Sequence, residues 1–237
     1  LILSIILTFS CEEKPKLPSI STTIVTEISS MNAVSGGNIT TDGGAPIISK
    51  GICWNTSENL FPEIAKSGAN CVRIVWYKNN SAPAYSNLTL LDSALSRCIQ
   101  QKMIPMLELH DVTCNNDTTA IINTANWFTQ TNVKTILLKY QKWLMLNPVN
   151  EAGYVMWNSN NETRFRLMYQ TIISNLRNAG LNMPLVLDAS DCGQHLNLWK
   201  SIGTSLQNFD PKHNLIFSAH TYWTSYANTT TAITNIL

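Results

Sequence analysis

Short apolar runs alternate with amphipathic segments along the chain after residue 60. In residues 88–102, apolar residues recur at i, i+4, i+7 and i+8, which is one face of a helix. This pattern predicts helices over 88–102, 133–142, 161–180 and 195–207, and apolar strands over 71–76, 104–109, 144–149, 185–189 and 215–219. Continuous apolar strands that alternate with amphipathic helices indicate a parallel sheet covered by helices.

Polar residues capable of chemistry follow the ends of these strands. They are His110 and Asp111, Asn150 and Glu151, Asp188, and His220 with Tyr222. An open doubly wound sheet and a closed barrel share the strand–helix alternation, but no glycine-rich phosphate loop follows the first strand. Polar groups at the C-terminal ends of several strands are typical of a TIM-barrel active site. We therefore predict an incomplete (β/α)8 TIM barrel over 60–237, with about six of its eight strands present.

The first eleven residues have the pattern of an export signal. The apolar run LILSIILTFS is too short to span a bilayer and has the length of a signal-peptide core. It ends at Cys11, and LTFSC resembles a bacterial lipobox. We therefore expect residues 1–11 to be the remnant of a lipoprotein signal with Cys11 as the lipidation site. The expected location is secreted or at the cell surface, with the lipid anchor in the bacterial outer membrane as the only membrane contact.

Residues 12–59 have a different texture from the rest of the chain. Short runs of Val, Ile and Thr are separated by Gly-Gly and Asp-Gly-Gly, which favour hairpin turns. This β-rich segment resembles a repeat found in bacterial surface proteins. Its last run, 47–53, is either the end of that repeat or the first strand of the barrel, and the sequence leaves both open.

The charge and the cysteines exclude several classes of protein. The net charge is +1 and the pI is about 7.8, which argues against a nucleic-acid partner. There are six cysteines and no C-x-x-C pair, so we expect neither a metal site nor a cofactor. Cys71 and Cys98 stand in apolar runs and are expected to be buried thiols. No disulfide framework is expected.

Five motifs follow one another in an order that resembles glycoside hydrolase family 5. They are SGANCVRIVW, MIPMLELHD, WLMLNPVNEAG, LVLDASDCGQ and LIFSAHTYW. The resemblance is strongest to the endo-β-mannanase and endoglucanase branch. It implies a hydrolase of plant β-1,4-polysaccharide, with mannan slightly ahead of glucan, acting by retaining double displacement. We expect the protein to be a monomer.

The resemblance assigns a role to each motif residue. Glu151 corresponds to the catalytic acid/base. The residues that correspond to substrate-binding positions are Arg73, His110, Asn150, His220, Tyr222 and Trp223. Arg73 matches the arginine that orients the nucleophile, and Asn150 matches the residue that binds the sugar 2-hydroxyl. Trp76 and Trp157 are further candidates for stacking on sugars, whereas Asp188 and Gln194 are expected to belong to the scaffold.

One part of the family pattern is not found. The family nucleophile is a glutamate that ends the seventh strand, but no Asp or Glu occurs after Asp210. Retaining hydrolysis needs two carboxyl groups, so we expect this chain alone to hydrolyse glycans at no useful rate.

Three other functions remain open on the sequence. The first is a non-catalytic carbohydrate-binding surface protein. The second is a metal-dependent hydrolase that uses His110, Asp111, Asp188 and His220. The third is a structural surface protein dominated by the N-terminal repeat.

Overall fold

The computed structural model describes much of the barrel region and only short strands before it. The described residues are 19–22, 27–28, 33–34, 37–40, 49–53, 59–78, 87–156 and 161–220, with side chains from residue 59 onward. Cys11, Trp157, Tyr222 and Trp223, which the sequence analysis singles out, lie outside the described residues.

Two short antiparallel pairs precede the main sheet. Strand β1 (Ser19–Thr22) pairs with β4 (Gly37–Thr40), and β2 (Glu27–Ile28) pairs with β3 (Ala33–Val34). Both pairings fall in the segment expected to be β-rich.

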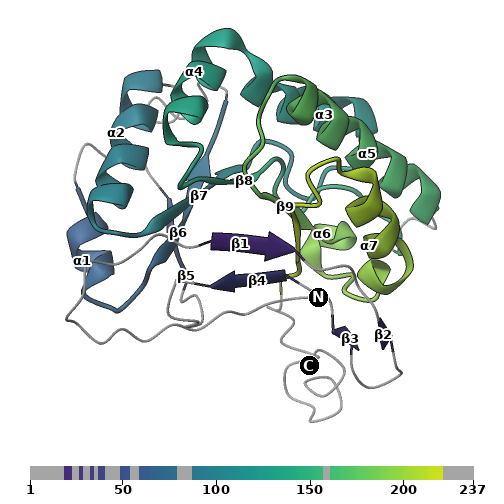
Figure 1. Cartoon of the computed structure of the whole chain (residues 1–237). Helices are drawn as coiled ribbons and strands as arrows, with labels where there is room; N and C mark the ends of the chain where they lie inside the picture. Colours follow the sequence, from purple (N-terminus) through teal and green to yellow (C-terminus); the bar gives the residue numbers. More distant parts are fainter. Residues whose placement is uncertain are drawn as a thin grey trace.

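A six-stranded parallel sheet forms the centre of the molecule (Figure 1). Its strand order follows the chain from β5 to β10. The strands are β5 (Ser49–Cys53), β6 (Cys71–Trp76), β7 (Ile104–Leu109), β8 (Met145–Asn147), β9 (Leu185–Asp188) and β10 (Leu215–Ser218). The structure thereby answers the question about 47–53, because β5 pairs in parallel with β6 over five residues.

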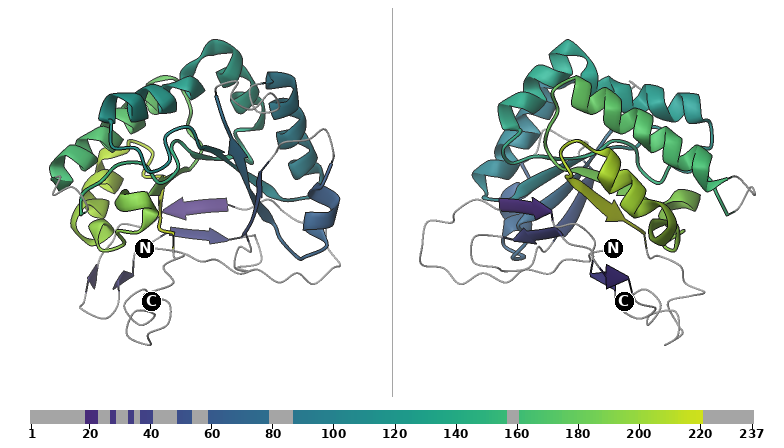
Figure 2. Two further views of the ribbon diagram at one scale, coloured as in Figure 1. Left: turned by 180° about the vertical axis from the view of Figure 1, so that it is seen from behind. Right: turned by 45° about the vertical axis from the view of Figure 1, so that its right-hand side comes forward.

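Helices connect the strands and cover one side of the sheet (Figures 1 and 2). They are α1 (Phe61–Ala65), α2 (Leu88–Gln100), α3 (Thr118–Ala125), the 3-10 helix η1 (Asn126–Thr129), α4 (Thr131–Tyr140), α5 (Glu162–Asn178), α6 (Ser190–Gly193) and α7 (Leu198–Phe209). Parallel strands joined through helices on one side of the sheet are the repeating unit of a barrel.

The helix ends follow local capping chemistry. The side chains of Asn87, Asp117 and Asn161 accept backbone N–H bonds at the starts of α2, α3 and α5. Helix α5 ends at Asn178, and Gly180, two residues further, has a φ of 85° in the left-handed region that favours glycine. The sequence pattern predicts a helix over 161–180 but none at α3, which has only eight residues.

The strands direct alternate residues to the two faces of the sheet. Residues such as Val72, Ile74 and Leu107 lie in the large apolar core with the helices. The opposite face carries a second, small cluster formed by Cys71, Ile104, Met145 and Val186. Two to four residues further along the same strands, this face becomes polar, with Arg73, Glu108, Asn147 and Asp188. The polar positions therefore gather at the C-terminal ends of the strands.

Two sequence-based expectations are wrong. Cys114 and Cys192 form a disulfide, with their Cα atoms 4.7 Å apart, although no disulfide was expected. The pair is 78 residues apart, so only the fold brings the two sulfur atoms together. Trp76 is completely buried in the large core, because its position on β6 directs it toward the helices, and so it is no sugar platform. Cys71 and Cys98 are buried thiols, as expected.

No helix in the described ranges is long and apolar enough to cross a bilayer.

Candidate active site

Arg73 is the hub of the polar cluster at the C-terminal ends of the strands. Its Nε donates to Glu108 Oε2 at 2.6 Å, and its Nη2 donates to Asn150 Oδ1 at 2.5 Å and to Asp188 Oδ2 at 3.2 Å. Its Nη1 lies 3.0 Å from His220 Nε2. Side chains from β6, β7 and β9 and from the segments that follow β8 and β10 therefore meet around one guanidinium.

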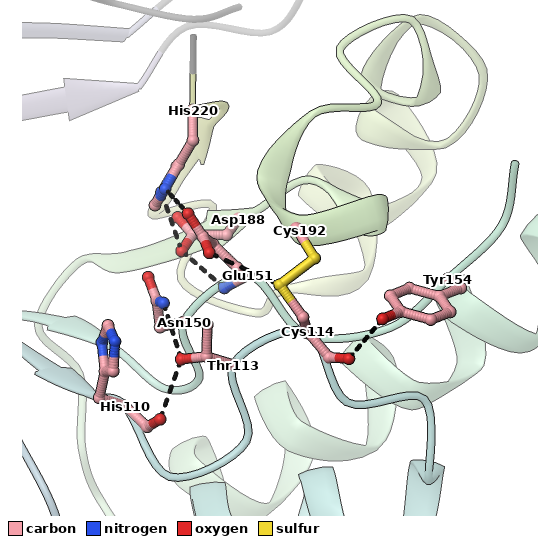
Figure 3. Close-up of a disulfide and its surroundings, with 9 residues drawn as sticks. All are labelled: His110, Thr113, Cys114, Asn150, Glu151, Tyr154, Asp188, Cys192 and His220. Atoms are coloured by element: carbon pink, nitrogen blue, oxygen red, sulfur yellow. Dashed lines mark hydrogen bonds and ion pairs between the residues drawn. A yellow bond between two sulfur atoms is a disulfide. The ribbon is translucent and has the colours of Figure 1, made fainter. Parts of the chain in front are cut away.

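Glu151 lies beside this hub, in the loop after β8 (Figure 3). Its carboxylate forms an ion pair with Nδ1 of His220 through Oε1. Its backbone N–H donates to Asp188 Oδ2 at 3.1 Å. The neighbouring Asn150 is fixed from its other side, because its Nδ2 donates to Thr113 Oγ1 at 2.9 Å. The structure therefore brings Arg73, Asn150, Glu151 and His220 together.

His110 occupies the other side of the cluster. Its Nδ1 lies 2.5 Å from Glu108 Oε1, and its ring meets the Tyr77 ring edge-on with centroids 5.4 Å apart. Asp111 instead ties down the loop after β6, since its Oδ2 accepts the Lys78 N–H at 3.0 Å. Among the described side chains, no group of three or more His, Cys, Asp or Glu is arranged to hold a metal ion.

The three carboxylates of the cluster differ in their access to solvent. Asp188 is fully buried, and Glu108 is only 1% exposed. Asp188 also accepts from Asn147 Nδ2 at 2.9 Å, so both of its oxygens are occupied by protein donors. Glu151 is 7% exposed and is thus the most accessible of the three carboxylates. Asp188 and Glu108 hold the cluster together, whereas Glu151 keeps a small solvent-exposed area.

Burial and charge act in opposite directions on the pKa values of the cluster. Burial alone would lower the pKa of His220, but its hydrogen bonds to Asp188 and Glu151 outweigh burial and raise the pKa to about 9. Burial would raise the pKa of Asp188, but the Arg73 charge and the His220 bond hold it well below its usual range. Near neutral pH, His220 is therefore an imidazolium between two carboxylates.

The backbone around Glu151 adopts an uncommon conformation. Of the six non-glycine residues with positive φ in the described ranges, four lie here: Cys114, Glu151, Asp191 and Cys192, with φ between 51° and 60°. Such residues cost about 1–3 kcal/mol each and persist only where the surroundings enforce them. Gly193, with φ 77°, packs so closely on His220 that an added Cβ would lie 2.8 Å from Cγ of that ring.

The sequence pattern did not single out Glu108, and Asp188 was expected to belong to the scaffold; in the structure both side chains hold the cluster together. Glu108 and Asp188 point to the same face of the sheet as Ile104 and Val186, because an even number of positions separates them along each strand. A charged residue at an inward position near the end of an apolar strand is the signal that could have identified them. Asp191, which accepts the N–H groups of Val155 and Met156, has no such signal because it lies in the short α6 and not on a strand.

The comparisons with known proteins agree with this architecture. The model of the cellulase family, glycosyl hydrolase family 5, matches residues 35–236, which is most of the chain. The chain belongs to glycosyl hydrolase family 5. A mannan endo-1,4-beta-mannosidase of Salipaludibacillus agaradhaerens is 26% identical over 215 residues, which cover 86% of this chain and 66% of that protein. The corresponding enzyme of Cellvibrio japonicus is 28% identical and is matched over 80% of this chain and 45% of its own length.

The solved structures confirm the fold of this family 5 chain. A mannohexaose complex of the Thermomonospora fusca beta-mannanase superposes with a TM-score of 0.66 at 22% identity, covering 83% of this chain and 68% of that one. The sheet described above is therefore a partial TIM barrel, as the sequence predicts. The chain spans two thirds or less of the length of the two curated relatives.

Proposed function

We propose that this family 5 chain carries the acid/base half of a retaining endo-β-1,4-mannanase, with Glu151 as the acid/base. The observation that carries this proposal is the position of Glu151. It is the more exposed carboxylate of a cluster in which Glu108 and Asp188 are saturated by protein donors. Two curated relatives named as mannan endo-1,4-beta-mannosidases favour mannan over glucan as the substrate.

The arrangement suits proton transfer to a glycosidic oxygen. When protonated, Glu151 donates its proton as the bond between C1 and the leaving oxygen breaks, and it later removes a proton from the attacking water. Asn150, held by Arg73 and Thr113, presents a fixed amide for a sugar hydroxyl. His110 and His220 line the two sides of the same site.

The retaining mechanism also needs a second carboxyl group as nucleophile, and no residue of this chain is assigned to that role. The buried carboxylates Glu108 and Asp188 are unsuitable as nucleophiles, because attack on C1 requires direct access to the sugar. Residues 211–237 contain no Asp or Glu. We infer that these 237 residues alone support no covalent turnover of mannan.

The experiment supplies the missing nucleophile from solution. The chain is incubated with an aryl β-mannoside in the presence and absence of azide or formate. We expect release of the phenol only with the anion, formation of an α-mannosyl azide, and loss of both in E151Q. Ordinary hydrolysis of mannan without an added anion would overturn the inference about turnover. No anion-dependent product together with no mannan binding would overturn the role of Glu151.

A non-catalytic carbohydrate-binding protein is the second candidate function. It is favoured by the same observation, a sugar-facing site in which the two most buried carboxylates are fully engaged. Binding to insoluble mannan with no glycosyl azide product would support it.

We further propose that the protein is a monomer outside the cytoplasm, anchored through a lipid on Cys11. The Cys114–Cys192 disulfide supports this location, because disulfides persist in oxidising compartments. Metabolic labelling with a fatty-acid probe that disappears in C11A would test the anchor.

A further inference from the structure

The Cys114–Cys192 disulfide lies directly beside the proposed acid/base (Figure 3). Cys114 belongs to the loop after β7, and Cys192 belongs to α6, just after β9. Glu151 comes from the loop after β8, the strand between these two. The disulfide therefore joins the two loops that flank the Glu151 loop.

Each end of the disulfide is also fixed to the Glu151 loop by backbone hydrogen bonds. The N–H of Cys114 donates to the carbonyl of Glu151 at 3.2 Å, and the N–H of Gly153 donates to the carbonyl of Asn115 at 2.7 Å. On the other side, the N–H of Asp191 donates to the carbonyl of Gly153 at 2.7 Å. The turn from Glu151 to Gly153 is thus held between the two cysteine loops.

The disulfide also touches the carboxylate itself. Cys114 Sγ lies 3.9 Å from Glu151 Oε2, while Oε1 of the same carboxylate is engaged by His220. One side of the carboxylate therefore faces a cation, and the other faces a sulfur that has no proton to donate while the disulfide is intact.

The left-handed conformations of Cys114, Glu151 and Cys192 have a common cause in this arrangement. Three non-glycine residues with φ of 53°, 51° and 55° meet at one place, and such conformations persist only where the surroundings fix them. A covalent bond between two of the three is the strongest constraint available there.

We propose that the Cys114–Cys192 disulfide is a positioning device for Glu151, and that a dithiol reductant releases it. The relevance for catalysis rests on the proposed function, whereas the structural claim about Glu151 does not. The dithiol gives up two electrons and two protons and becomes a cyclic disulfide, and Cys114 and Cys192 become two thiols. The new Cys114 S–H is then a donor toward Glu151 Oε2 and competes with His220 for the carboxylate.

The test follows the Glu151 carboxyl group directly. Protein labelled with 13C at the glutamate carboxyl carbon is titrated by NMR in the oxidised and dithiol-reduced forms, with the Glu151 signal assigned by its loss in E151Q. We expect the signal to move on reduction and its titration midpoint to shift by about half a pH unit or more. The double variant C114S/C192S should resemble the reduced protein and should not respond to the dithiol, which is the matched control.

Three results would overturn the proposal. The first is an unchanged Glu151 signal and midpoint after complete reduction, verified by alkylation and mass spectrometry. The second is full alkylation of Cys114 and Cys192 in protein that was never reduced. The third is global unfolding on reduction, which would make the bond a purely structural link. Because the readout is a carboxyl signal, it remains valid even if the azide experiment shows no glycosyl transfer.

Discussion

Arg73 and Arg177 lie at opposite ends of the parallel sheet and form two very different ion clusters. Arg177 binds Asp210 through two parallel bonds of 2.8 Å and donates to the carbonyls of Leu181 and Met183, just before β9. The Arg177 side chain is only 3% exposed, and Asp210 is its one ion-pair partner among the described residues. Arg73 faces Glu108, Asp188 and His220 and keeps 20% of its side chain exposed.

The difference shows how one residue type serves two purposes in this barrel. At the amino ends of the strands, a closed and charge-balanced pair contributes to stability alone. At the carboxyl ends, several charges share a site that is open to solvent, so they remain available to a ligand. This division agrees with the general organisation of TIM barrels, in which chemistry lies at the carboxyl ends and stability at the amino ends.

The largest loss of stability is expected from breaking the Arg177–Asp210 ion pair. R177M leaves the buried Asp210 carboxylate without its cation, which should cost about 3–5 kcal/mol of unfolding free energy. Urea unfolding measures this loss. R177K, which keeps the charge but not the two parallel bonds, should lose less. A loss in R177K as large as that in R177M would contradict this expectation, because it would show that the two parallel bonds, and not the charge, carry the stabilisation.

The next effect comes from His220 and depends on pH. Its pKa is raised from 6.5 to about 9, so its stabilising contribution is complete below pH 6.5 and is lost as the pH rises through 9. At about 1.4 kcal/mol per pKa unit, the full effect is about 3 kcal/mol. Unfolding free energies of the wild type and H220Q between pH 6 and 10 measure it. Parallel pH profiles in the two proteins would contradict the assignment.

A smaller loss of stability is expected from removing Arg73 from its cluster with Glu108 and Asp188. R73M leaves Glu108 and Asp188 without their main cation, but His220 remains beside Asp188, so we expect a loss of about 1–3 kcal/mol. Under the proposed mannanase function, binding of mannohexaose, measured by calorimetry, should be lost entirely. Retained binding together with a large stability loss would make Arg73 the equivalent of Arg177.

The smallest effect is expected from an exposed pair. Lys139 Nζ lies 2.8 Å from Asp92 Oδ1, with both side chains in contact with solvent. Pairs of this kind contribute little, because water screens them. K139M should therefore leave the unfolding midpoint within experimental error. A clear drop in the unfolding midpoint would mean that solvent exposure does not determine how much each of the three ion clusters contributes to stability.

The strands were predictable from the sequence because their apolar runs are continuous. The ranges 71–76 and 104–109 match β6 and β7 residue for residue, and both runs are buried against helices. The run 144–149 shortens to β8, Met145–Asn147, because Pro148 cannot donate to a ladder and the chain then bends into the loop that carries Asn150.

The site was only partly predictable. Residues after strand ends, such as Asn150 and Glu151, stand out because they interrupt an apolar pattern. Glu108 lies inside such a run, and its role depends on which face of the sheet it points to. The disulfide depends on contacts between loops 78 residues apart, which no local pattern encodes.

Strand β5 has a mechanical consequence for the part of the chain ahead of it. It is the edge strand of the sheet, and its five paired positions set Gly51 opposite Arg73. A pull on the chain along β5 is therefore resisted in shear by the β5–β6 hydrogen bonds, so tension on this edge strand reaches the strand that carries Arg73 directly.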